Sequence, residues 1–263
     1  MSNTATAEVA FRPFADIFSE AIETLRQELS EYSFIALVGA VLAGLVVLLC
    51  GVIDTPVSLS LIPPLVALSA LLTLATCAAA FGSANNQLQP DAGSAAIAML
   101  QRLPVLLLPW LPLLVGLGVA TYALAAFSDY IDKARIPGTL QVLAIIAVAL
   151  LYAYPRSLAA AATFEEQFSG AQAQSISAFV VRHSGRRIQA MWVVVLAPAA
   201  LMLGLSLVVG LDPVTGALVT CFFVGAMPLA AAMSSLLFYD AASQIELAPH
   251  PASTAHRIDP RRA

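Results

Sequence analysis

Residues 34–53 read FIALVGAVLAGLVVLLCGVI, an unbroken apolar stretch without Asp, Glu, Lys, Arg or His. A helix needs about 20 apolar residues to cross the hydrocarbon core of a bilayer. The strands of a membrane β-barrel instead alternate apolar and polar residues over about 10 positions. The stretch therefore predicts a transmembrane helix.

Five further blocks of the chain have the same character. They are Leu61–Phe81, Val105–Phe127, Ile136–Tyr154, Ile188–Val209 and Ala217–Phe238, and none contains Asp, Glu, Lys, Arg or His. Over the whole chain 60% of residues are hydrophobic and 11% are charged, with a mean hydropathy of +0.87. In soluble domains about a quarter of the residues are charged. The sequence predicts an all-α polytopic membrane protein with six transmembrane helices.

The positive charges predict the orientation of these helices. Ten of the 12 Lys and Arg residues fall in the segments that share one side of the membrane with both termini. Lys and Arg accumulate on the cytoplasmic side, so both termini are expected there. The predicted parts are a cytoplasmic segment, 1–33, a transmembrane domain, 34–238, with a cytoplasmic loop at 155–187, and a cytoplasmic polar tail, 239–263. The first part is acidic and holds no apolar core, so no cleavable signal peptide is expected.

The cytoplasmic loop concentrates basic residues. It carries Arg156, Arg182, Arg186 and Arg187. Arginines at a membrane surface attract anionic lipid head groups, so we expect these four to contact them. Apolar residues between them recur at helical spacing, which predicts a short helix lying in the interface and ending at Gly185.

A helical segment of this kind comes before three of the predicted spans. The segments begin near residues 14, 91 and 173, a period of about 80. The first is an amphipathic helix within 1–33, whose apolar stripe holds Phe14, Ile17, Phe18, Ala21, Ile22, Leu25 and Leu29. Each unit then reads as a span, a short outer turn and a returning span. The pattern predicts three hairpins with interfacial amphipathic helices.

The loop also carries a loose motif. Its elements are Pro155, an acidic residue at Glu165 or Glu166, Ala173 with Ser177, and the run Gly185-Arg186-Arg187. In this motif and in its six spans the chain resembles the bacterial YciC-like membrane family, and it is similar to the membrane region of some glycerophosphodiester phosphodiesterases. The resemblance implies the six-span fold and a bacterial cytoplasmic (inner) membrane. It implies no activity, because the phosphodiesterase catalytic domain is a separate soluble domain.

Residues suited to catalysis are scarce in the predicted spans. Ion-coupled carriers and proton relays need ionisable groups at membrane depth, and the six blocks hold none. We therefore predict no catalytic residue, no metal ligand and no cofactor, and no nucleic-acid surface. An enzyme would need titratable groups at the cytoplasmic face, where only the loop around Glu165 could supply them.

Small residues recur every four positions in two of the spans. They are Ala36, Ala40 and Gly44 in the first span, and Ala226, Ala230 and Ser234 in the last. Such ridges let helix backbones approach closely. They predict packing within the bundle, with contact to another subunit as the alternative.

The amphipathic helix within 1–33 is acidic. Asp16, Glu20, Glu23 and Glu28 lie along it. Interfacial helices that bind anionic lipid are rich in Lys and Arg on their polar face, so this helix is unsuited to that role. We expect it to bind a basic protein partner. The alternative is a solvated helix that shields the end of its own bundle.

These features favour a non-catalytic accessory subunit, which packs against a larger membrane protein complex and stabilises it. Its partners would be membrane lipids and other membrane subunits. The alternative is a small permease or lipid-handling protein with a site among the proline-containing spans. A polar cavity between those spans would favour the alternative.

Overall fold

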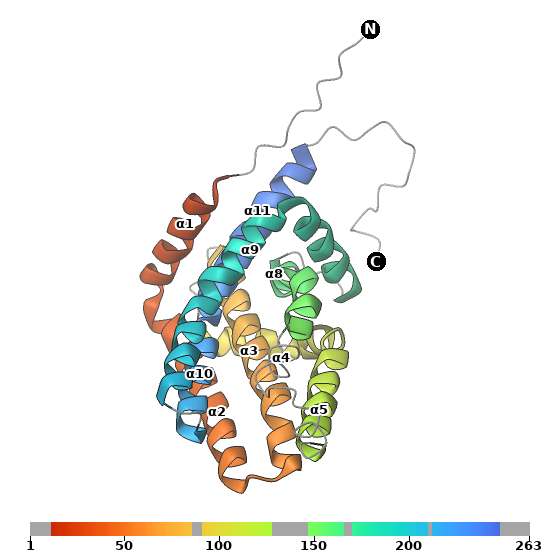
Figure 1. Ribbon diagram of the computed structural model, residues 1–263. Helices are drawn as coiled ribbons and strands as arrows, with labels where there is room; N and C mark the ends of the chain where they lie inside the picture. Colours follow the sequence, from red (N-terminus) through yellow and green to blue (C-terminus); the bar gives the residue numbers. More distant parts are fainter. Residues whose placement is uncertain (1–11, 86–90, 128–146, 166–169, 210–211, 248–263) are drawn as a thin grey trace.

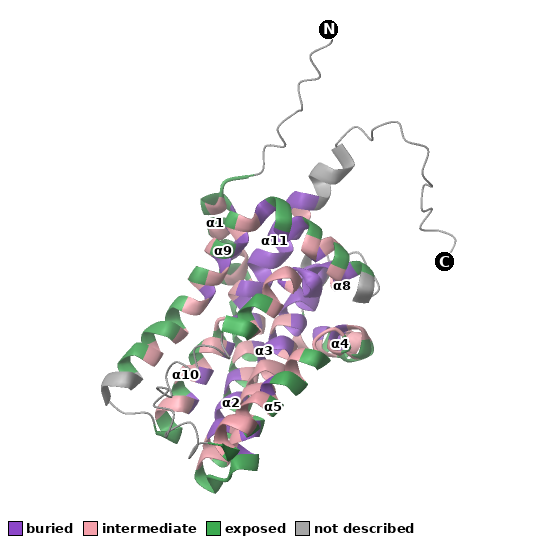
Figure 2. Cartoon of the chain, turned by 45° about the vertical axis from the view of Figure 1, so that its right-hand side comes forward, coloured by how far each residue is buried: buried purple, intermediate pink, exposed green. Residues whose placement is uncertain are grey.

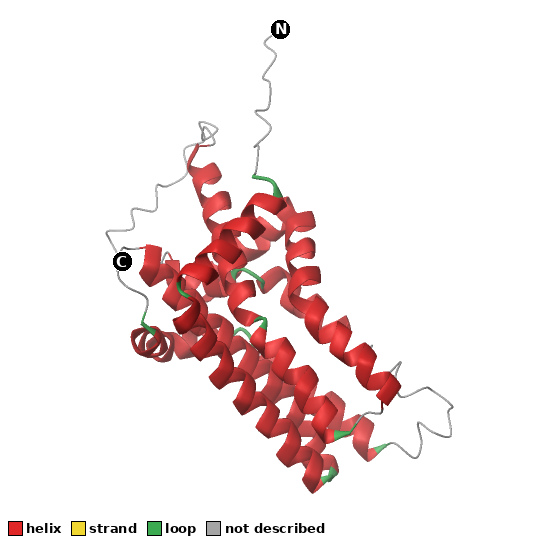
Figure 3. Ribbon diagram, turned by 90° about the vertical axis from the view of Figure 1, so that its left-hand side faces the viewer, coloured by secondary structure: helices red, strands yellow, loops and turns green. Residues whose placement is uncertain are grey.

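The computed structural model describes residues 12–85, 91–127, 147–165, 170–209 and 212–247. Within these segments all regular structure is helical, as Figure 3 shows. The predicted all-α class is therefore confirmed for the described part of the chain. The helices are α1 (Phe14–Gln27), α2 (Leu29–Ile53), α3 (Pro56–Asn85), α4 (Ala92–Leu107), α5 (Leu111–Ala126), η1 (Tyr154–Arg156), α8 (Ala159–Glu165), α9 (Gly170–Val209), α10 (Pro213–Gly225) and α11 (Met227–Leu247), and residues 147–153 are helical as well.

Several of these helices are long and apolar enough to cross a membrane. The candidates are Leu29–Ile53, Pro56–Gly82, Gln172–Leu205 and Pro213–Ala241, and the pair α4 and α5 makes a fifth if the two are counted as one span. The predicted span Ile136–Tyr154 lies mostly outside the described residues. The described residues thus contain four or five candidate spans, against six predicted. The length and apolar composition of these helices are those of a helical membrane protein.

The helix α11 is the centre of the bundle. Buried residues make up 67% of the most apolar window in Pro213–Ala241, against 17% in Gln172–Leu205. Between Met227 and Ala241 every residue except Leu229 and Tyr239 is buried, as expected of a helix enclosed by others. Figure 2 shows the buried residues gathered around α11, α3 and α8, while the outer sides of α2, α9 and α10 are largely exposed.

The chain reverses between α2 and α3 in a tight turn. Asp54 ends α2 in the left-handed conformation, with φ 48° and ψ 45°, which a short polar residue tolerates better than a bulky one. Thr55 then caps α3, because its Oγ1 accepts a 3.1 Å hydrogen bond from the Ser58 N–H. The two helices lie side by side, and their turn is at the opposite end of the bundle from α1 (Figure 1). We call the two ends the turn end and the α1 end.

The helices α4 and α5 form a bent pair. They are bent by 71° at the break between Leu107 and Leu111, where Pro109 cannot donate a helical hydrogen bond. Asp91 caps α4 by accepting a 2.9 Å hydrogen bond from the Ser94 N–H. Glu31 reaches across from α2 and accepts a 3.0 Å hydrogen bond from the Ala92 N–H. The predicted span Val105–Phe127 is therefore broken near its start.

The helix α9 is also broken, at the point where the loop was expected to enter the membrane. Ser184 has non-helical backbone angles, φ −116° and ψ 24°. The break separates an amphipathic half from the apolar half that follows, and α9 packs on α8 and η1. The sequence predicted the end of this helix at Gly185, one residue further along.

Candidate functional site

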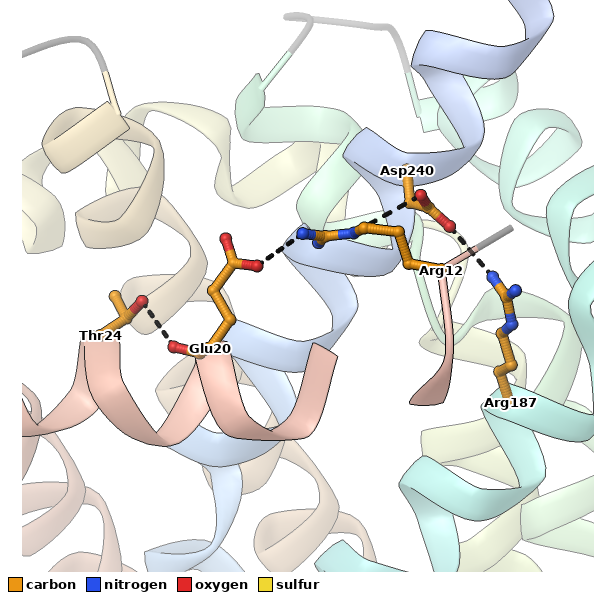
Figure 4. A network of polar contacts seen from close by, with 5 residues as sticks. All are labelled: Arg12, Glu20, Thr24, Arg187 and Asp240. Carbon is orange, nitrogen blue, oxygen red and sulfur yellow. Dashed lines mark hydrogen bonds and ion pairs between the residues drawn. The ribbon is translucent and has the colours of Figure 1, made fainter. Parts of the chain in front are cut away.

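A network of ion pairs lies at the α1 end. Its centre is Asp240 on α11, whose side chain is only 6% exposed. Arg187 of α9 donates from Nη1 to Asp240 Oδ2 at 3.0 Å, and the Nε of Arg12 lies 3.7 Å from Oδ1. Arg12 also pairs with Glu20 of α1 at 2.7 Å (Figure 4). Two guanidinium groups thus share one buried carboxylate, which joins the start of the chain to α9 and α11.

The network is suited to holding helices together. A buried charge is costly unless it is paired and hydrogen-bonded, and both conditions are met at Asp240. The five residues drawn in Figure 4 are Arg12, Glu20, Thr24, Arg187 and Asp240, and none of these five is a His, Cys or Ser. Within the described residues no three His, Cys, Asp or Glu side chains are grouped so as to hold a metal ion. The ion pairs join Arg12 and Glu20 to α9 and α11.

A second polar cluster joins the turn at η1 to the break in α9. The Tyr154 hydroxyl donates a 3.0 Å hydrogen bond to the Gly185 carbonyl. Ser177 Oγ donates to the Pro155 carbonyl at 2.9 Å and accepts from the Leu158 N–H at 3.1 Å. The loop motif elements Pro155, Ser177 and Gly185 therefore meet in one place, although they are far apart in the sequence.

The indole of Trp192 completes this cluster. Its Nε1 donates a 2.7 Å hydrogen bond to the buried hydroxyl of Ser157. Ser157 Oγ in turn donates to the Tyr154 carbonyl at 2.7 Å. These contacts fix α9 to η1 immediately beyond the break at Ser184.

The four arginines predicted to contact lipid have different environments. Arg187 is bound by Asp240, and Arg156 lies over the ring of Tyr152, with its Cζ 3.8 Å from the ring centroid. Arg182 and Arg186 are exposed on α9. Contact with head groups stays a prediction for all four side chains, of which Arg187 is also paired with Asp240 inside the protein.

The acidic residues of α1 lie on its outer side. Ile17 and Ala21 are fully buried, because that face packs on α11. Asp16 and Glu23 are exposed, and Glu20 is exposed but paired with Arg12. Glu28 is half-buried at the junction with α2. The apolar stripe of α1 is thus partly used within the bundle, while most of its carboxylates face outward.

The small-residue ridges lie at helix contacts. The Cys221 thiol of α10 donates a 3.3 Å hydrogen bond to the Ala40 carbonyl of α2. A Cβ added at Gly44 would lie 2.8 Å from that sulfur. In α11, Ala230 and Ser234 are both 1% exposed. Ala36 and Ala226 are half-buried. The close approach of α2 and α10 therefore depends on Ala40 and Gly44 of the first ridge.

Two hollows between the helices are lined by apolar residues. One lies between α5 and residues 147–153, and the other between α2 and α10. The first contains Leu113, Leu117 and Val148, with Tyr152 as its polar side chain. Neither resembles the polar cavity that the permease alternative would favour.

Asp240 follows the last predicted span and falls within the predicted polar tail, 239–263. The helix α11 instead continues past Phe238 to Leu247. The buried positions Met233, Leu237 and Ala241 follow helical spacing through this point. That spacing was the available signal, and it places Asp240 inside the bundle. The pairing of Ser157 with Trp192 had no signal in the sequence.

The fold is that of a helical membrane protein. At its α1 end the ion pairs of Asp240 join Arg12 and α9 to α11. Comparison with protein-family models, with curated proteins and with solved structures finds no match. Its function is therefore argued from the residues of the chain itself.

Proposed function

We propose that the protein is a non-catalytic membrane subunit that packs against a larger membrane protein complex and stabilises it. In this proposal the chain spans a bacterial cytoplasmic membrane six times as three hairpins, with both termini in the cytoplasm. The α1 end of the bundle then faces the cytoplasm. This orientation is supported by the ten Lys and Arg residues on the side of the termini.

The outer face of α1 carries the proposal. The apolar face of α1 is held on α11 through Ile17 and Ala21, which leaves the acidic face exposed. Asp16 and Glu23 form no ion pair within the described residues. A carboxylate surface is repelled by anionic lipid and attracts a basic protein surface. The helix is therefore held in position with its charges available to a partner.

The rest of the described surface fits a subunit of a membrane complex. Large apolar side chains of α2 and α9 are exposed, among them Leu37, Leu49, Val193 and Leu201. Such surfaces contact either lipid or another transmembrane helix. The acidic face of α1 and these apolar sides together give a partner one polar and one apolar surface to contact.

The experiment is recovery of the native assembly. Membranes from cells that express the tagged chain are solubilised in a mild detergent, and the recovered material is separated on a native gel and identified. The proposal expects a stoichiometric set of other membrane subunits. It also expects Asp16→Lys/Glu23→Lys to lose them while the chain keeps its own unfolding temperature.

A matched control uses Ser175→Lys, which adds a positive charge to an exposed position on α9. This variant should keep the partners, because it leaves the face of α1 unchanged. Recovery of the wild-type chain as a lone monomer or homo-oligomer would overturn the proposal. Equal loss of partners in the α1 variant and the control would show that the face of α1 is not the contact.

A further inference from the structure

An apolar hollow of about 330 Å³ lies between α5 and the helical residues 147–153. Pro112, Gly116 and Leu117 line one wall, and Val148 lines the other. The Val148 side chain is 65% exposed, so the hollow opens on the outside of the bundle. The volume is about twice that of the cavity of about 150 Å³ that admits a benzene ring in another protein. It has room for part of a hydrocarbon chain.

One end of the hollow is built from aromatic side chains held in place. Tyr152 lines it, and its hydroxyl donates a 2.7 Å hydrogen bond to the Pro109 carbonyl at the break between α4 and α5. Trp110 packs edge-on against the same ring, with the ring centroids 6.4 Å apart. Trp and Tyr are enriched where acyl chains meet head groups. This end of the hollow therefore has the character of the membrane interface.

Arg156 stands one helical turn beyond Tyr152 at this end. Its guanidinium carbon lies 3.8 Å from the centroid of the Tyr152 ring, and its Nη1 donates a 2.8 Å hydrogen bond to the Tyr152 carbonyl. Its Nε is shielded and has no hydrogen-bond acceptor among the described residues. Arg156 also forms no ion pair within that part of the chain. A fixed cation without an ion pair among the described residues thus lies against Tyr152, which lines the hollow.

We propose that this hollow and Arg156 together bind one anionic phospholipid. One acyl chain lies along α5 between Gly116 and Val148, and the phosphate accepts hydrogen bonds from the guanidinium of Arg156. A guanidinium presents paired N–H groups that match two oxygens of a phosphate. An anionic lipid is favoured because no carboxylate of the described residues neutralises Arg156. The site is independent of whether the chain belongs to a complex.

The test is lipid retention by the full chain in native mass spectrometry. Purified protein is mixed with phosphatidylglycerol or phosphatidylcholine at equal concentration, and bound lipid is counted per chain. The wild-type chain should retain one phosphatidylglycerol more strongly than phosphatidylcholine. Arg156→Gln should lower phosphatidylglycerol retention about fivefold, the effect of one cation beside an anionic head group.

A second variant tests the hollow without changing charge. A Cβ added at Gly116 would meet no other atom within 4 Å, so Gly116→Leu fills free space. It should reduce retention of phosphatidylglycerol while the unfolding temperature is kept. The exposed Arg26→Gln on α1 is the matched control and should retain lipid as the wild type does.

The outcomes separate clearly. Equal retention of the two lipids by the wild-type chain would overturn the proposal, as would a Gly116→Leu variant that binds phosphatidylglycerol normally. Binding of oleate as strongly as phosphatidylglycerol would show a fatty-acid site instead. If Arg156→Gln fails to fold, Arg156→Lys keeps the charge and removes the paired donors, and weaker phosphatidylglycerol retention by that variant supports the proposal.

Discussion

The carboxylate of Asp240 lies 3.0 Å from the guanidinium of Arg187, and both side chains are largely withdrawn from solvent. Asp240 is on α11 and Arg187 follows the break in α9. This contact therefore holds the second half of α9, just beyond its break, against α11.

Loss of the Arg187 charge should destabilise the bundle. In Arg187→Met the buried Asp240 loses its 3.0 Å partner and keeps the longer 3.7 Å contact with Arg12. Removing one partner of a buried pair costs about 3 kcal/mol, because the other charge remains buried. Thermal unfolding in detergent measures the effect. The neighbouring exposed Arg186→Met serves as the control, and an equal change in both variants would contradict the prediction.

The hydrogen bond between Trp192 and Ser157 should also be measurable. Ser157→Ala leaves the indole N–H without its acceptor, at a cost of about 1–3 kcal/mol. The loss of stability should appear as a lower unfolding temperature. The lost hydrogen bond should also change the fluorescence emission of Trp192, measured in a Trp110→Phe background where Trp192 is the only tryptophan of the chain. Trp192→Phe should remove most of the cost of Ser157→Ala. Additive effects in the double variant would show that the two side chains are not coupled.

The contact between α2 and α3 requires a glycine. A Cβ at Gly39 would overlap the hydroxyl of Thr73, so Gly39→Val forces the two helices apart. Overpacking of this kind costs about 1–3 kcal/mol. Gly204→Val in α9 is the control, because no atom lies within 4 Å of its added Cβ. Denaturant unfolding should separate the two variants, and similar midpoints would contradict the close approach at Gly39.

The start of α10 should weaken in acid. The backbone N–H and the hydroxyl of Thr215 bond to Asp212 and lower the pKa of its carboxyl from the ordinary 3.8. A lowered pKa means that this stabilisation is present above pH 3.8 and is lost as the pH falls through the folded value. The hydrogen-exchange rate of the Gly216 amide in the wild-type chain should therefore rise as the pH falls below the folded pKa of Asp212. The variant Asp212→Asn should show no such rise, because it keeps an acceptor that cannot titrate. The same pH dependence in both chains would contradict the prediction.

The sequence predicted the all-helical class and several of the long apolar helices because their signals are local. The apolar run 34–53 lies within α2, and the break in α9 at Ser184 is one residue from the predicted end at Gly185. Length and apolar composition decide whether a helix can cross a bilayer, and both can be read in a single window. The paired prolines Pro109 and Pro112 likewise mark the place where α4 and α5 part.

The contacts between distant segments could not be predicted in this way. Asp240 was assigned to the tail because a charged residue after an apolar run usually marks its end. Only the arrangement of α9 and α11 shows that Arg187 neutralises it. The contact of Glu31 with the N–H of Ala92 is equally distant in sequence. Such pairs depend on which helices become neighbours, and one window of sequence does not contain that information.

The wide separation of Arg12 and Asp240 in the sequence has a consequence for biosynthesis. A ribosome delivers α1 well before α11. Until α11 is made, Ile17 and Ala21 of α1 lack the helix that covers them, and Arg12 lacks its buried carboxylate. The helix α1 can therefore settle only after α11 has been made, so a chain that stops before α11 is left with this apolar face uncovered.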